Sequence, residues 1–355
     1  MSKKRWLYLA VAVVCTLGLV VVGCAKKPAA KGIKTYRLGT SAEGSFGYEI
    51  GVGMAKVIKD HAKTINITAT PTPGSTASNK LLNTGELDFS YANAITLQQA
   101  YTNKGPFAKE PVTWRAYQTV YTYTADWMIM VPKDSPIKCY KDLVGKKVFP
   151  MKAGTGIYDV YEIVLKKLGY WDKIERKQVS MMGAADALKL GTIDAAGCYT
   201  VAAGVVIPSW IRNIDARMDC RVLEPTSEEK AIIEKAKIPG VMISEVPKKC
   251  FSKDVVPGKE AIWTYSVPYG YHASPAVDAD RVYEFTKIFW EYPDELIAMN
   301  PGFGQLKGGK EFAAKSMGAM SELVPVHPGA AKYYKEMGIW KDSWKVGEPK
   351  PSPFK

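Results

Sequence analysis

The sequence predicts an α/β protein with two lobes, each built on a mainly parallel sheet flanked by helices, and a ligand cleft between the lobes. Strand and helix patterns alternate along the chain, and a second series of elements repeats the order of the first. With 355 residues, the chain also exceeds the roughly 250–300 residues beyond which a single core usually divides.

The first series begins with an alternating strand at 35–38, followed by a glycine-rich turn and a helical pattern at 50–58. A strand at 65–69, a helix ending near 81–85 and a strand at 88–93 come next. This βαβαβ order predicts parallel strands joined by right-handed crossovers.

The second series has strands at 127–131 and 147–150 and a helix at 158–168. It continues with a helix at 184–190 that stops at a glycine, and a strand that starts near 191–194. Two further helices are expected at 231–237, behind a capping box from Thr226 to Glu229, and at 282–289.

We expect the first lobe to comprise 34–124 plus 275–345 and the second lobe to comprise 125–274. No long Pro/Gly/Ser-rich linker lies between them, which predicts short hinges. The proline-rich end of the chain, 346–355, predicts a loose tail.

The N-terminus resembles a bacterial lipoprotein signal. Lys3, Lys4 and Arg5 precede an uncharged apolar run that ends in Val-Val-Gly before Cys24. We expect a signal peptide at 1–23, a lipid on Cys24 and a tether at 24–33, which attaches the protein to the periplasmic or extracytoplasmic face of a membrane. The alternative is a permanent anchor, because 18 apolar residues nearly span a bilayer.

The charge pattern argues against nucleic acid as a partner. The 48 Lys+Arg against 35 Asp+Glu give a net charge of +13, but the cations are dispersed in pairs such as Lys166-Lys167 and Lys248-Lys249. Phosphate backbones require clustered cations. The charge instead favours attraction of a small anion.

Four cysteines remain outside the signal region. No CxxC or Cys/His cluster occurs, so we expect no metal site and no cofactor. Among the three possible connectivities, the hypothesis is a disulfide between Cys220 and Cys250, which would close a loop of ~30 residues and contribute ~3 kcal/mol. Cys139 and Cys198 are expected to be free.

Two glycine-rich turns, 39–51 and 153–156, each separate a strand from a helix. Ligands bind at this edge of open α/β sheets, and helix N-termini attract anions, so the facing turns predict an anion clamp. Ordinary tight turns are the alternative. The three histidines lack an adjacent nucleophile with an orienting acid, so we expect no enzyme activity.

Five stretches of the chain are informative when taken together and in order. They are GTSAEGSFGYEIG (39–51), PGSTASNKLLNTGELDFSYAN (73–93), DSPIKCYKDLVGKKV (134–148), AADALKLGTIDA (184–195) and VPVHPGAAKYYKEMGIW (324–340). They resemble the TAXI-type solute receptors of tripartite ATP-independent periplasmic (TRAP) transporters. The resemblance implies the two-lobe type II periplasmic-binding-protein fold. It also implies a monomeric receptor that closes on a small carboxylate-bearing solute and delivers it to the permease subunits. A lipoprotein that presents its ligand to a membrane sensor kinase is the alternative.

The resemblance also implies the ligand-binding positions. They are Gly44, Ser45, Phe46 and Tyr48 in the first turn, Ser75 and Asn93 in the next elements, and Gly154, Thr155 and Gly156 in the second lobe.

Several aromatic side chains and one lysine complete the expected site. Lys152 adds a cation beside the second turn, while Phe46 and Ile157 replace hydroxyl groups of the family pattern, so the solute is expected to be a small organic anion with an apolar part. Acidic amino acids, dicarboxylates and aromatic or branched carboxylates are the candidates. Tyr158 and the predicted strand-end residues Tyr121 and Tyr199 are expected at the ligand, within an aromatic group that also holds Tyr91, Tyr123, Trp127 and Tyr161; core packing is the alternative for each.

Overall fold

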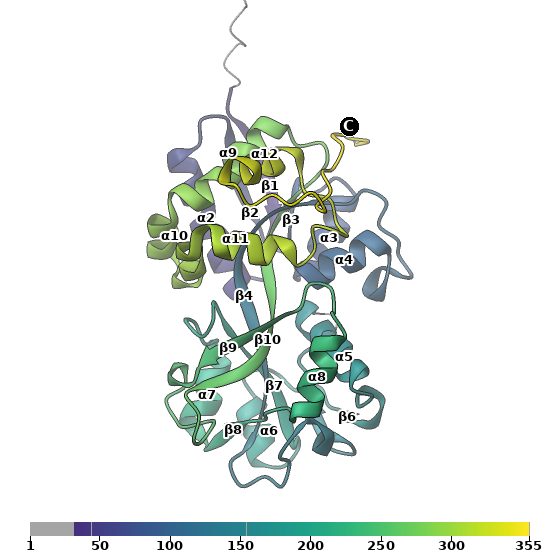
Figure 1. Ribbon diagram of the computed structural model, residues 1–355, viewed down its shortest axis with the longest axis vertical. Helices are drawn as coiled ribbons and strands as arrows, with labels where there is room; N and C mark the ends of the chain where they lie inside the picture. Colours follow the sequence, from purple (N-terminus) through teal and green to yellow (C-terminus); the bar gives the residue numbers. More distant parts are fainter. Residues whose placement is uncertain (1–31, 44, 154, 355) are drawn as a thin grey trace, which may run out of the picture. The chain divides into compact units, whose positions relative to one another are not determined.

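In the computed structural model, the described residues form one mixed sheet of ten strands with helices on both faces (Figure 1). The structure describes residues 32–43, 45–153 and 155–354, and residues 33–355 form one unit. The strands are β1 (Lys34–Gly39), β2 (Ile65–Thr70), β3 (Phe89–Asn93), β4 (Tyr117–Pro132), β5 (Lys147–Phe149), β6 (Glu175–Arg176), β7 (Ala195–Val201), β8 (Cys220–Val222), β9 (Met242–Pro247) and β10 (Ala261–Ala273).

The helices cover the sheet in two groups. They are α2 (Phe46–His61), α3 (Ser75–Asn83), α4 (Ala94–Thr102), α5 (Gly156–Lys167), α6 (Ala184–Lys189), α7 (Ser209–Arg217), α8 (Ser227–Lys235), α9 (Ala279–Glu291), α10 (Pro293–Met299), α11 (Gly309–Gly318) and α12 (Pro328–Met337). Short 3-10 turns are η1 (Gly105–Phe107), η2 (Tyr140–Leu143), η3 (Trp171–Lys173), η4 (Lys248–Cys250) and η5 (Pro301–Gly308).

The α/β prediction with two lobes is confirmed. Lobe 1 denotes β1–β3 with α2–α4 and α9–α12, and lobe 2 denotes β5–β9 with α5–α8 (Figure 1). Within lobe 1, β1 pairs in parallel with β2 and β3, and within lobe 2, β5 pairs in parallel with β6 and β7. The exact residue boundaries of the lobes remain a prediction.

The connection between the lobes differs from the expected short hinges. The strand order β2-β1-β3-β10-β4-β7-β5-β6 is continuous, and the antiparallel strands β4 and β10 pass from one lobe into the other. β4 is buried along 15 of its 16 residues, and only Pro132 is partly exposed. The sequence patterns identified only the second half of β4 and missed β10, because continuous burial removes the alternation that marks a strand.

The local predictions for the remaining elements hold. Ile50, Met54 and Ile58 form the buried face of α2. At α8, the Thr226 hydroxyl accepts a hydrogen bond from the backbone N–H of Glu229 at 3.2 Å, and the Glu229 carboxylate accepts one from the Thr226 N–H at 2.7 Å. This confirms the capping box.

A bulge interrupts the pairing of β4 with β10. Tyr269 pairs with Tyr123, but the next residue, Gly270, pairs with Tyr121, so Thr122 has no partner in the register. A Cβ atom at Gly270 would lie 1.9 Å from the carbonyl oxygen of Val120. The bulge therefore requires glycine, and it reverses which face the side chains of β4 point to.

A buried carboxylate joins the strands just beyond this bulge. Asp126 is 1% exposed, and burial raises its pKa against the opposing effect of its hydrogen bonds. The donors are the hydroxyls of Thr124 at 2.9 Å, Ser266 at 2.6 Å and Thr200 at 3.1 Å, and the N–H of Ala203 at 3.0 Å. These bonds connect β4, β7 and β10 where the sheet passes between the lobes.

The C-terminal segment is packed on lobe 1, so the expected loose tail is wrong for the residues described. The N–H of Gly347 donates to the carbonyl of Val326 at 2.8 Å, and the N–H of Lys350 donates to that of Pro275 at 3.1 Å. The ring of Phe354 packs edge-on against Trp114 and covers Gly85. Proline fixes the extended backbone, and these contacts hold it against the lobe.

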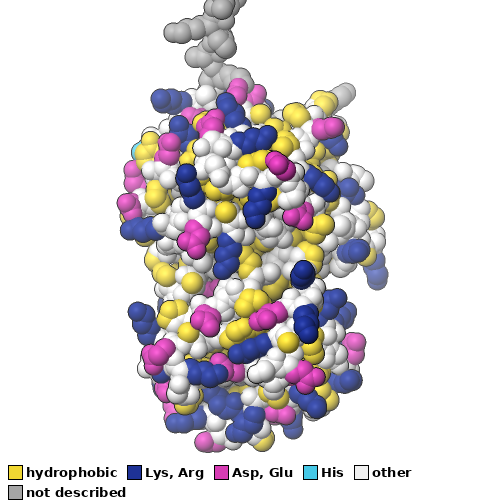
Figure 2. All heavy atoms as spheres, viewed as in Figure 1, with side chains coloured by type: hydrophobic (Ala, Val, Ile, Leu, Met, Phe, Trp, Pro, Cys, Tyr) yellow, Lys and Arg dark blue, Asp and Glu magenta, His cyan; other side chains and the backbone are white. Residues whose placement is uncertain are grey.

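Lys and Arg side chains are dispersed over the surface among acidic groups on the face that Figure 2 shows. No helix within the described residues has the length and apolarity needed to cross a membrane. The described residues also contain no cluster of three His, Cys, Asp or Glu side chains that could hold a metal ion.

Replacing Gly270 should test the bulge. We expect Gly270→Ala to lower the free energy of unfolding by about 1–3 kcal/mol, since the added methyl overlaps the Val120 carbonyl. Chemical denaturation measures the change. In the control Gly318→Ala, the new methyl lies 3.7 Å from its nearest neighbour, so stability should be unchanged or rise by about 0.5–1 kcal/mol. Equal stability of the two variants would contradict the role of Gly270.

Candidate functional site

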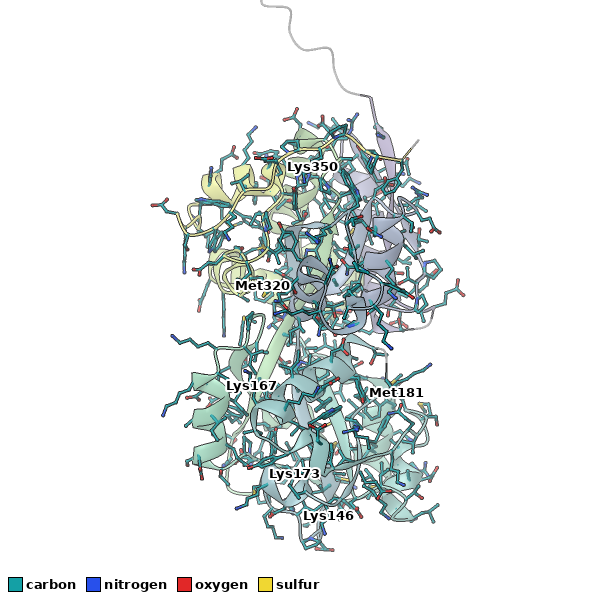
Figure 3. The ribbon with its side chains drawn as sticks, turned by 90° about the vertical axis from the view of Figure 1, so that its right-hand side faces the viewer. Lys146, Lys167, Lys173, Met181, Met320 and Lys350 are labelled. Atoms are coloured by element: carbon teal, nitrogen blue, oxygen red, sulfur yellow. The ribbon has the colours of Figure 1, made fainter. Side chains whose placement is uncertain are left out.

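A cavity of about 430 Å³ lies between the two lobes. Lobe 1 and the adjoining parts of β4 and β10 contribute Ser41, Ala42, Ser45, Phe46, Gly47, Pro73, Gly74, Ser75, Tyr91, Tyr123 and Tyr269; Ala125, Met151, Lys152, Ala153, Thr155, Gly156, Ile157, Met181, Tyr199 and Val201 complete the lining from β4 and lobe 2. Figure 3 places Met181 at the edge of lobe 2 that faces lobe 1. The volume suits a small-molecule ligand. We call this space the interlobe cavity.

Seven of the expected ligand-binding residues line the interlobe cavity. They are Ser45, Phe46, Ser75, Lys152, Thr155, Gly156 and Tyr199. Gly44 and Gly154 lie outside the described residues, as does Cys24. Their roles remain predictions.

Three helices begin at the interlobe cavity. Ser45 caps α2 by accepting a hydrogen bond from the Tyr48 N–H at 3.4 Å, and Thr155 caps α5 in the same way with the Tyr158 N–H. Gly74 precedes α3 with a φ of 134°, a conformation that favours glycine. The N-terminal ends of these helices give the cavity wall a positive potential.

The loop before α5 is tightly constrained. Met151 is 1% exposed and has a φ of 76°, which is unfavourable for a side chain that carries a Cβ. The carbonyl of Lys152 accepts hydrogen bonds from the Thr155 hydroxyl at 2.7 Å and the Thr155 N–H at 3.3 Å. Gln178 accepts a hydrogen bond from the N–H of Ala153 at 3.1 Å. The loop thereby holds Lys152 at the mouth of the cavity.

Tyr121 is not at the cavity, contrary to expectation. Its hydroxyl donates to the Gln118 side chain at 2.9 Å, and its ring packs edge-on against His272 at 5.0 Å. The reason is the bulge at Thr122, which turns Tyr121 and Tyr123 to opposite faces of the sheet although they are two residues apart.

Asn93, Tyr48 and Tyr158 also do not line the cavity. Asn93 caps α4 by accepting from the Thr96 N–H at 2.7 Å, and its amide donates to the Tyr269 hydroxyl at 3.0 Å. It therefore positions a lining residue from behind. Tyr158 packs edge-on against Trp171 at 5.2 Å, while Tyr48 is half-buried on α2 outside the lining.

Apart from Phe46, the aromatic wall is formed by residues that were not among the expected ligand-binding positions. Tyr123 and Tyr269 are stacked with centroids 5.3 Å apart at 2°, and Phe46 meets Tyr123 edge-on at 5.1 Å. Tyr91 lies 5.6 Å from Tyr269. The tyrosine density in the sequence included Tyr91 and Tyr123, but Tyr269 belongs to the strand that the patterns missed.

Hydrogen bonds link the hydroxyl groups of this wall to one another and to Asn93. Tyr91 and Tyr123 form a hydrogen bond with each other, and Tyr269 accepts one from Asn93. Burial raises the pKa of all three tyrosines, and it raises the pKa of Tyr199 to about 12. The four side chains are therefore neutral, and all four line the cavity.

Asp159 lies in the first turn of α5, next to the interface between the lobes. Burial, and to a smaller extent the Glu162 carboxylate, raises its pKa to about 7. Its buried Oδ2 atom has no hydrogen-bond partner within the described residues. Below neutral pH this carboxyl is uncharged, so it does not oppose an anion held at the start of α5.

The expected disulfide is not present. Cys220 and Cys250 are free thiols, as are Cys139 and Cys198. Cys220 pairs with Pro132 at the start of β8, whereas Cys250, in η4, lies against Gly204. Burial raises the pKa of both thiols to about 12.

Comparison with known proteins identifies the family. The model of the NMT1-like family matches residues 38–338, so the chain belongs to that family. This match does not test the resemblance to TAXI-type receptors, which remains a prediction.

Solved structures that are similar to this chain include three binding proteins. The periplasmic aliphatic sulphonate binding protein SsuA from Escherichia coli is 15% identical, with 86% of this chain and 83% of that chain covered and a TM-score of 0.45. The putative periplasmic sulfonate-binding protein SsuA from Methylobacillus flagellatus KT is 15% identical, with 90% and 99% covered and a TM-score of 0.49. The probable amino-acid ABC transporter extracellular-binding protein ytmK from Bacillus subtilis is 14% identical, with 78% and 96% covered and a TM-score of 0.44.

The raised pKa of Asp159 predicts how stability depends on pH. In the unfolded chain the carboxyl ionises near its ordinary pKa of 3.8, whereas in the folded protein it ionises only near pH 7. The folded state therefore loses stability as pH rises between these values. We expect the free energy of unfolding of Asp159→Asn, relative to that of the wild type, to increase from pH 4 to pH 7. Above pH 7 the difference between the two proteins should stay constant.

Chemical denaturation at several pH values measures this difference. Asp172→Asn is the control, because Asp172 is an exposed carboxylate of lobe 2 with 84% side-chain exposure. Its difference from the wild type should vary little with pH. A pH-independent difference for Asp159→Asn would contradict the assignment.

Proposed function

We propose that this member of the NMT1-like family is an extracytoplasmic solute-binding lipoprotein. It captures a small carboxylate-bearing solute by closure of the two lobes and delivers it to the membrane subunits of a TRAP transporter. The observation that carries the proposal is the interlobe cavity, which both lobes line and where three helices begin. Such a cavity holds its ligand by contacts from both sides.

Close contacts beside the cavity support a closing motion. A Cβ atom at Gly156 of lobe 2 would lie 2.6 Å from Nδ2 of Asn93 and 2.8 Å from Oγ1 of Thr96 in lobe 1. Gly240 of lobe 2 lies against Ala94, and its N–H donates to the carbonyl of Ala319 at 3.2 Å. Glycine at both points allows the backbones of the lobes to meet. A solute that binds both lobes stabilises this arrangement by its differential affinity for it.

The cavity lining suits binding rather than catalysis. Within the described residues, the lining contains no cysteine, histidine, aspartate or glutamate. The hydroxyl groups of Ser45 and Thr155 serve as helix caps and have no general base beside them among the lining residues. This composition supports a receptor.

Two parts of the proposal rest on sequence. Delivery to a TRAP permease follows from the five stretches that resemble TAXI-type receptors. Attachment to the membrane follows from the basic residues, the apolar run and Cys24 at the N-terminus.

Closure should be visible in solution. A thermal-shift screen over acidic amino acids, dicarboxylates, keto acids and aromatic acids identifies a ligand, because binding to the folded state raises its melting temperature. With that compound at saturation, small-angle scattering should show a smaller radius of gyration. Gly156→Ala should fold normally but bind at least tenfold more weakly, since its methyl overlaps Asn93 and keeps the lobes apart.

Gly318→Ala serves as the control and should bind as the wild type does. If no compound raises the melting temperature, the proposal that the protein captures a solute is wrong. If a compound binds without compaction, the closure mechanism is wrong.

Lipid attachment gives a separate prediction. In a bacterial host, Cys24→Ser should abolish metabolic lipid labelling and leave an unprocessed precursor of higher mass. The control Cys139→Ser alters a cysteine of the folded body and should be labelled and processed normally. Unchanged labelling and size in Cys24→Ser would contradict the lipoprotein assignment.

A further inference from the structure

The cavity lining identifies a narrower class of solute. We propose that the interlobe cavity binds a solute with one aromatic ring and a single anionic group, an inference that rests on the proposed function. The ring would lie against the tyrosine wall and the anionic group near Lys152. Each end of the solute is argued separately below.

The charges at the cavity permit one anionic group. Lys152 is the one charged side chain among the described lining residues. A dicarboxylate would find one cationic side chain for its two charges, and an amino acid would find no carboxylate for its ammonium group, whereas buried charges are usually paired. The lining therefore disfavours both classes, which were among the candidates from the sequence.

The anionic group of the solute would find a hydrogen-bond donor as well as the positive charge of Lys152. The Ser45 hydroxyl accepts a hydrogen bond from the Tyr48 N–H, which leaves its own hydrogen for a ligand. The Thr155 hydroxyl differs, since it donates to the Lys152 carbonyl. Ser45 and Lys152 come from different lobes, so an anionic group between them bridges the lobes, and a hydrogen bond to a charged group contributes about 1.5–3 kcal/mol.

The remaining wall presents rings. Tyr123 and Tyr269 are stacked, Phe46 stands perpendicular to Tyr123, and Tyr91 adjoins Tyr269. Tyr199 contributes a ring from lobe 2, where it packs against Trp127 at 5.5 Å. Tyr269 accepts a hydrogen bond from Asn93, and one of Tyr91 and Tyr123 accepts from the other, so two hydroxyl hydrogens of the wall remain as donors beside its rings.

Aromatic ligands gain more from this wall than aliphatic ligands do. Ring pairs in stacked or edge-on geometry contribute about 0.5–1.5 kcal/mol beyond their buried area. A planar ring can make such contacts with several of these side chains at once. A saturated ring of similar size buries comparable area but lacks the ring-to-ring term.

Titration calorimetry on the purified protein tests the class with matched probes. They are phenylacetate, cyclohexylacetate, benzenesulfonate, succinate and glutamate. We expect phenylacetate to bind at least tenfold more tightly than cyclohexylacetate, succinate or glutamate. Measurable binding of benzenesulfonate would show that the anionic group can be a sulfonate. Absence of that binding would restrict the anionic group to a carboxylate. Both results agree with a solute that has one aromatic ring and one anionic group.

Variants separate the two ends of the solute. Lys152→Met should weaken phenylacetate binding by roughly one to two orders of magnitude, whereas Lys173→Met, an exposed lysine of lobe 2 labelled in Figure 3, should leave it unchanged. Tyr123→Leu should weaken phenylacetate at least tenfold, while Tyr48→Leu, outside the lining, should have little effect. Phe46→Leu gives the same readout at a less buried position if Tyr123→Leu does not fold.

The outcomes distinguish this inference from the proposed function. Tighter binding of succinate or glutamate than of phenylacetate would overturn the aromatic class and leave solute capture intact. Cyclohexylacetate within twofold of phenylacetate, or no binding of either aromatic probe, would also overturn it. Failure of every compound in the wider thermal-shift screen would overturn both.

Discussion

The antiparallel pairing of β4 with β10 is the interaction on which the rest of the molecule depends. It runs from Tyr265 opposite Trp127 to Ala273 opposite Tyr117, so the same two strands belong to the cores of both lobes. Any motion of one lobe against the other must bend or twist these strands. The hydrogen bonds to Asp126 join β4 to β7 and β10 along this stretch and would keep the strands together during such a motion.

Two kinds of structure line the interlobe cavity, namely the turns with their helix N-termini and the long strands. In the proposed binding mode, helix N-termini and glycine-rich turns hold the anionic group, and these depend on backbone geometry that many sequences can adopt. The long strands supply most of the wall of rings, where single side chains would decide which solute fits. On this proposal, specificity would be determined mainly by positions on β3, β4 and β10.

Much of the fold and about a third of the cavity lining were predictable from sequence, for a physical reason. Turns are local, so the pattern of their own segments predicted the glycine-rich turns that hold Ser45 and Thr155, and the resemblance to TAXI-type receptors added Ser75. The sheet is not local. Tyr121 and Tyr123 point to opposite faces of the sheet because of the bulge at Gly270, almost 150 residues later in the chain. The periodicity of β4 alone does not reveal this bulge. Local sequence likewise does not reveal the neighbour of Cys250, which is Gly204 in another turn of lobe 2.

The packed C-terminal segment also bears on how the chain folds as it is synthesised. Lobe 1 is built from residues on both sides of lobe 2, and its last contacts, such as Trp114 with Phe354, join segments about 240 residues apart. Contacts of such long range form slowly because a large loop must close first. A nascent chain that begins at β1 therefore cannot complete lobe 1 until lobe 2 has emerged. Its apolar strands meanwhile remain exposed, and such surface favours aggregation until the last segment packs.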